Sequence, residues 1–176
     1  MSLLRFLGIG GNSDGRENEP ASLIEISAQL DAIPEDEARF VAAFSYLLAR
    51  IAGTDLRTDD AERDAMAHRL ETFAGIDAGQ ATLLATTAIE AAATHRASDD
   101  HLVARAFKDM SGDSERIRLL RCLYAVAAAD DNISAAEDNE IFEVARSIGV
   151  RRLDVVALRS EFKEHLGSLK TLPSER

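Results

Sequence analysis

The sequence predicts an all-α protein, a compact bundle of about seven helices built from two pseudo-repeated helical hairpins. Four observations support this fold class. From residue 23 onward apolar residues recur at helical spacing, glycine and proline become sparse, and no segment shows a convincing strand-like alternation of polar and apolar residues. A helix, acidic loop, helix unit occurs twice, near Asp55 to Glu62 and at Asp130 to Glu137. The two units can bury their apolar stripes against each other.

Local signals place the helices in order along the chain. Pro34 and the three acids after it suit a helix start, where a missing amide proton costs nothing and negative charge meets the positive dipole end. Phe40, Phe44 and Ile51 lie on the apolar stripe of this first helix. Others are expected at about 60–74, 77–95, 98–110, 115–130 and 152–166, and one more carries Glu137 in its first turn and stops at Gly149.

The chain of 176 residues is predicted to contain one domain. Residues 1–22 are expected to be a flexible N-terminal segment and linker, residues 23–166 a single helical domain, and residues 167–176 a tail. The first nine residues are too few to span a membrane and lack a secretory cleavage site, so a protein that does not span a membrane is expected. The single cysteine, Cys122, lies in an apolar run, which predicts a buried thiol and a reducing, cytoplasmic location.

The charge balance argues against nucleic acid as a partner. Lys and Arg number 20 against 31 Asp and Glu, which gives a net charge of -11, whereas binding a polyanion needs clustered basic residues. An acidic surface suits cations, basic partner surfaces or solubility alone.

The acidic loops hold the candidate metal ligands. Asp55 and Asp130 end a helix, where the dipole is negative, so each needs a positive partner such as a divalent cation. Oxygen ligands alternate in the second loop as in the first part of an EF-hand, but Ala135 and Ile141 stand where that motif needs Gly and Glu. An oxygen-only set predicts calcium or magnesium rather than zinc. The candidate ligands are Asp55, Glu62, Asp130, Asp131, Asn132, Ser134 and Glu137.

Helix capping is the alternative interpretation of the same residues. Ser134 with Glu137, and Asp59 with Glu62, have the spacing of capping boxes, in which the two side chains satisfy free amides of the first turn. Arg57 could also neutralise Asp55 without a metal. The sequence leaves both interpretations open.

No catalytic template is complete in this sequence. The four histidines lie in different predicted helices with no metal-binding or Glu-x-x-His spacing, and no phosphate-binding glycine loop or serine nucleophile motif is present. The expected function is therefore a non-enzymatic binding module, with a structural adaptor that binds no ion as the alternative. A hydrolase that uses Asp55 and Asp130 has the least support.

The run AAADDNISAAEDNEIFEVARSIGV, residues 127–150, carries a resemblance to a known family. It resembles the TerB-like family, which includes the tellurite-resistance protein TerB and the N-terminal region of a membrane-anchored DnaJ-type co-chaperone; the resemblance covers about residues 36–162. Asp131 stands where family members commonly place a glycine. The resemblance implies a compact helical bundle, a role in responses to toxic oxyanions and other stress, metal binding by acidic residues, protein partners at the inner membrane face, and no established enzymatic reaction.

Overall fold

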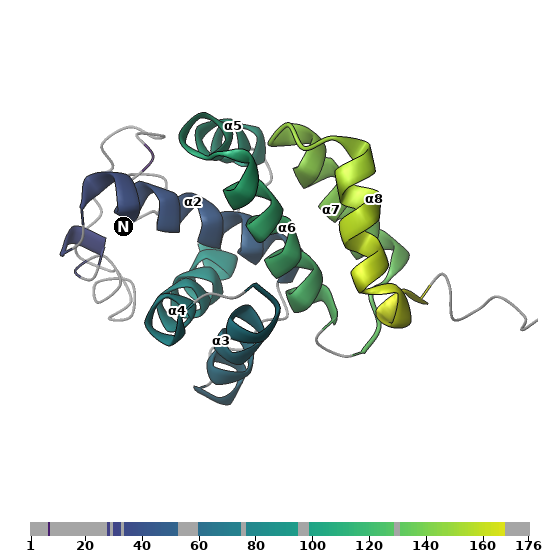
Figure 1. Ribbon diagram of the computed structural model, residues 1–176. Helices are drawn as coiled ribbons and strands as arrows, with labels where there is room; N and C mark the ends of the chain where they lie inside the picture. Colours follow the sequence, from purple (N-terminus) through teal and green to yellow (C-terminus); the bar gives the residue numbers. More distant parts are fainter. Residues whose placement is uncertain are drawn as a thin grey trace, which may run out of the picture.

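The computed structural model describes residues 7, 28, 30–32, 34–52, 60–74, 77–94, 99–128 and 131–167. This part of the chain forms seven α-helices and no strand, which confirms the all-α prediction (Figure 1). None of the described helices has both the length and the apolar character needed to cross a membrane. The helices are α2 (Glu35–Ala52), α3 (Asp60–Ala74), α4 (Ala78–Thr94), α5 (Asp100–Met110), α6 (Asp113–Ala127), α7 (Ala135–Ser147) and α8 (Arg152–Glu161), followed by a short 3-10 helix, Lys163–His165.

Helix α6 lies centrally in the bundle, between the α2, α3 and α4 group and the α7 and α8 pair (Figure 1). The two sequence units pack differently. In the second unit α6 packs directly on α7, whereas in the first unit both α2 and α3 pack chiefly on α4. Three fully buried small residues of α4, Ala81, Ala85 and Ala88, allow neighbouring helices to approach closely. The repeat in the sequence is therefore not a repeat of the helix packing.

An aromatic cluster joins α2 to α5 in the core. The ring centroid of Phe40 lies 5.7 Å from that of Phe44 and 5.4 Å from that of Phe107, and Phe44 and Phe107 are 6.0 Å apart. Phe44 and Phe107 are fully buried. These distances are typical of favourable aromatic pairs, so the phenylalanine stripe predicted for the first helix is the surface that holds α5.

A pair of salt bridges holds the C-terminal end of α2 against α5 and α7. The Arg50 side chain, only 14% exposed, pairs with Glu140 of α7, and its Nε lies 3.2 Å from Asp100 Oδ2 at the start of α5. Arg50 is in the last turn of α2 and Asp100 is in the first turn of α5, so each charge interacts favourably with the dipole of its own helix. In the sequence Arg50 is 50 residues from Asp100 and 90 residues from Glu140, and the two acids are 40 residues apart. These contacts therefore fix the relative positions of α2, α5 and α7.

Several helix ends lie where the sequence predicted them. Asp77 Oδ1 accepts the amide proton of Gln80 at 3.1 Å and so caps α4, and Gly149 follows α7 with a φ of 81°. Two helices end earlier than predicted, because α6 ends at Ala127 and α8 ends at Glu161. After α8 the buried Phe162 turns the chain into the 3-10 helix, which leads it back to the second acidic loop.

Cys122 is fully buried on α6, as predicted, and burial raises its pKa from 9.0 to about 12, although Arg118 and Arg121 oppose the shift. At a pH between 9.0 and about 12, the Cys122 thiol binds fewer protons in the unfolded chain than in the folded chain. The contribution of the neutral thiol to stability is therefore fully present below pH 9 and is lost as the pH rises, by at most about 1.4 kcal/mol per pH unit.

We therefore expect the free energy of unfolding to fall between pH 8 and pH 10.5, and to fall less in Cys122→Ala. Urea unfolding under reducing conditions at both pH values measures this slope in each protein. Equal slopes would contradict the assignment of the pH dependence to Cys122.

Candidate functional site

The structure describes four of the seven candidate ligands, Asp131, Asn132, Ser134 and Glu137. Asp55 and Asp130 lie outside the described residues, as do the side chain of Glu62 and the whole of Asp59. The first acidic loop, with its proposed capping box and Arg57, is therefore not part of the described structure. Of the second acidic loop, the structure describes residues 131–137.

A C-terminal strap, residues 163–167, holds the second acidic loop. The amide of Ile133 donates to the carbonyl of His165 at 2.6 Å, and the amide of Gly167 donates to the carbonyl of Ile133 at 3.0 Å. Ile133 and Leu166 form an isolated parallel β-bridge, and both side chains are buried. Gly167, which the sequence assigned to the tail, thus belongs to the folded unit. A β-carbon at Gly167 would lie 2.7 Å from Asn132 Oδ1 and 3.2 Å from the Ile133 carbonyl, so glycine permits this close approach.

The loop turns at Asp131, whose φ is 60°. Most side chains disfavour this left-handed conformation, but aspartate tolerates it because its short polar side chain can bond locally. A glycine would also suit this position. The Asp131 side chain is 89% exposed, and its Oδ1 lies 3.5 Å from Nδ1 of His165 on the strap. No local sequence pattern connects His165 with this loop.

Ser134 and Glu137 form the predicted capping box at the start of α7. Ser134 Oγ accepts the amide proton of Glu137 at 3.2 Å, and Glu137 Oε2 accepts the amide proton of Ser134 at 2.8 Å. The capping interpretation of these two residues is confirmed. To bind a cation, Ser134 Oγ or Glu137 Oε2 would have to give up or share its hydrogen bond with a backbone amide.

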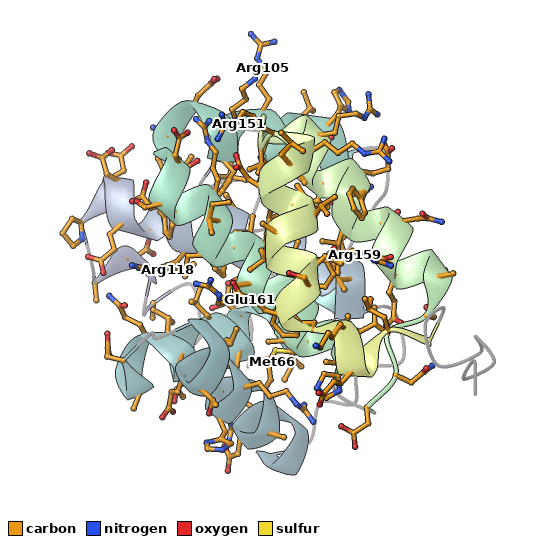
Figure 2. The ribbon with its side chains drawn as sticks, turned by 45° about the vertical axis from the view of Figure 1, so that its right-hand side comes forward. Met66, Arg105, Arg118, Arg151, Arg159 and Glu161 are labelled. Carbon is orange, nitrogen blue, oxygen red and sulfur yellow. The ribbon has the colours of Figure 1, made fainter. Side chains whose placement is uncertain are left out.

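A buried carboxylate lies next to the cap and was not singled out from the sequence. Asp138 is 9% exposed, and its Oδ1 accepts the hydroxyl proton of Tyr124 at 3.1 Å. Arg159 of α8 donates its Nε proton to both Asp138 oxygens, at 3.0 and 2.9 Å, and its Nη2 lies 2.8 Å from Oδ2. Figure 2 shows Arg159 between α8 and α7. These contacts connect α6, α7 and α8 behind the second acidic loop.

The network changes the protonation behaviour of its members. Burial, together with the charge and hydrogen bond of Asp138, raises the pKa of the Tyr124 hydroxyl. The hydrogen bond to Asp138 raises the pKa of Arg159. The Tyr124 ring stacks on Phe162, with centroids 5.4 Å apart and an interplanar angle of 21°. Tyr124 therefore stays neutral and Arg159 charged near neutral pH, so the network is one buried ion pair with a hydroxyl donor.

The geometry does not gather a closed metal site within the described residues. In the part of the chain that is described, no three His, Cys, Asp or Glu side chains lie together as ligands for one ion. Asp131 extends into solvent beside His165, while Glu137 turns back to cap α7. Chemically, the loop presents an exposed carboxylate on a backbone that the strap and the cap hold in place.

Residues 39–160 match the family model described as tellurite resistance protein TerB. The match extends from α2 into α8, so it includes the second acidic loop, Asp138 and Arg159 but ends before the strap. No curated protein and no solved structure gives a significant match to the chain.

Proposed function

This chain belongs to the TerB family of tellurite resistance proteins, and from that membership we propose that it is a non-enzymatic binding module of a tellurite-resistance-like stress response. In this proposal the module works in the cytoplasm and holds a protein partner at the inner membrane face. The second acidic loop is the binding surface, and its ligand is a divalent cation, calcium or magnesium, or a basic group of the partner.

The main support for this proposal is that the exposed Asp131 side chain lies on a loop whose backbone is held in place. Two backbone hydrogen bonds to the strap and the capping box hold the loop, yet the Asp131 side chain remains 89% exposed. A charged group on a loop that is already ordered loses little conformational entropy when it binds a ligand. The net charge of -11 also favours a cationic ligand over an anionic one.

A cation at this loop would be held by Asp130, Asp131 and Asn132, whose oxygens suit calcium or magnesium. Ser134 and Glu137 could join it only by weakening the cap of α7. That cap favours the second candidate function, a structural adaptor in which the acidic residues order the loop and bind no ion.

Calorimetric titration of the metal-free protein with calcium, magnesium and zinc tests the choice between these two functions. If the loop holds an ion, calcium or magnesium is expected to release or absorb heat and to raise the melting temperature, since a ligand of the folded state stabilises it. Asp130→Ala should abolish both effects. Asp64→Ala removes an exposed acid of α3 as a matched control and should preserve them.

The absence of heat at millimolar calcium and magnesium would refute ion binding and leave the adaptor. In that case Asp130→Ala is expected to leave stability unchanged or slightly improved, because the sequence predicts this carboxylate at a helix C-terminus, where the negative end of the dipole would repel it if it has no partner.

A further inference from the structure

An open hollow between α2 and α5 lies apart from the second acidic loop. Its volume is about 350 Å³, and it is lined by Arg39 of α2 and by five residues of α5: Leu102, Arg105, Ala106, Asp109 and Met110. Pockets that bind small molecules have volumes of roughly 300–1,000 Å³, so the hollow suits a small ligand.

The floor of the hollow is an apolar stripe of α5. Leu102, Ala106 and Met110 follow one another at intervals of four residues and therefore lie along one line of the helix. Ala106 and Met110 pack partly against the core, but Leu102 is 40% exposed, one of three large apolar side chains that are exposed in the described part of the chain. This stripe offers apolar surface that α2 does not fully cover.

The charged groups around the stripe leave a positive excess. Arg39 is half-buried and makes no hydrogen bond or ion pair within the described structure. Arg105 points into solvent (Figure 2) and approaches Asp109 only at 4.0 Å, with both side chains more than 70% exposed. Such a pair contributes little. Among the residues that line the hollow, two arginines stand against one aspartate, and Arg39 makes no ion pair with a described residue beside this apolar surface.

We propose that this hollow binds a small organic carboxylate, whose charged group pairs with Arg39 and whose apolar body lies along Leu102, Ala106 and Met110. The planar guanidinium of arginine can donate two parallel hydrogen bonds to a carboxylate. A partly buried arginine strengthens such a pair because it is less screened by water than an exposed one. The site is independent of the acidic loop and does not rest on the function proposed for it.

Titration of the full-length, ¹⁵N-labelled protein with hexanoate tests this proposal. We expect saturable shifts of the backbone amides of Arg39 and Ala106, with weaker binding of acetate, which lacks the apolar body, and of hexanol, which lacks the charge. Arg39→Gln is expected to weaken hexanoate binding about tenfold, equivalent to about 1.4 kcal/mol.

Arg118→Gln is the matched control, because Arg118 is an exposed arginine of α6 that does not line the hollow (Figure 2). It should bind hexanoate as the wild type does. Equal weakening by the two substitutions, acetate binding as tight as hexanoate binding, or no saturable shift would overturn the proposal. So would an acidic helical peptide that shifts the same amides when hexanoate does not, since the hollow would then be a protein-docking surface.

Discussion

Asp138→Ala is expected to lower the free energy of unfolding by about 3–5 kcal/mol, the usual effect of removing one partner from a buried ion pair. The substitution would leave the guanidinium of Arg159 and the hydroxyl of Tyr124 without their shared acceptor at the junction of α6, α7 and α8. The Arg159 side chain is 26% exposed, so water could solvate it in part, and the loss should lie toward the lower end of the range. Urea unfolding at pH 7 measures the change.

Glu143→Ala provides a control on the same helix, because Glu143 pairs with Arg146 on the exposed side of α7. Its loss should change stability by less than about 0.5 kcal/mol. Tyr124→Phe should cost about 1 kcal/mol through the lost hydrogen bond. A double-mutant cycle between Asp138→Ala and Arg159→Ala should give a coupling of about 1 kcal/mol or more. If Asp138→Ala costs no more than Glu143→Ala, the network does not stabilise the fold.

Ile133→Ala should lower the free energy of unfolding by about 2–5 kcal/mol, as other large-to-small changes of buried aliphatic residues do. Ile133 is 1% exposed, and its backbone makes both hydrogen bonds to the strap. The substitution should therefore also release the strap locally. Hydrogen exchange at the Gly167 amide should speed up by more than global destabilisation alone explains.

Val156→Ala is the matched aliphatic control for this experiment. Val156 is 47% exposed on α8, so its truncation should cost less than about 0.5 kcal/mol and leave the exchange of Gly167 unchanged. Similar losses in the two variants, or a Gly167 amide that exchanges as in the wild type, would show that Ile133 does not hold the strap.

The sequence predicted the features that depend on neighbours within about one or two helical turns. The phenylalanine stripe, the cap at Asp77, the stop at Gly149 and the capping box of Ser134 and Glu137 all follow from local spacing, and the structure shows each of them. The metal-ligand set stays a prediction, because Asp55, Asp130 and the Glu62 side chain lie outside the described residues.

Two adjacent acids show where sequence reasoning stops. Both Glu137 and Asp138 fit the first turn of α7, where acids interact favourably with the helix dipole. Glu137 caps its own helix, a contact three residues away, and was predicted. Asp138 instead binds Tyr124 and Arg159, which are 14 and 21 residues away. No local pattern distinguishes the two roles, because the second depends on how α6, α7 and α8 cross.

The sequence by itself thus determined the helices, the cap of α4 at Asp77, the capping box of α7 and the buried cysteine, since short-range hydrogen bonds and apolar spacing decide these. The tertiary structure alone decided that α4 packs between α2 and α3 where α7 packs directly on α6, that the strap holds the second acidic loop, and that His165 faces Asp131. The physical reason is that each of these contacts joins segments whose separation in space is set by the packing of the whole bundle, and not by the residues on either side of them.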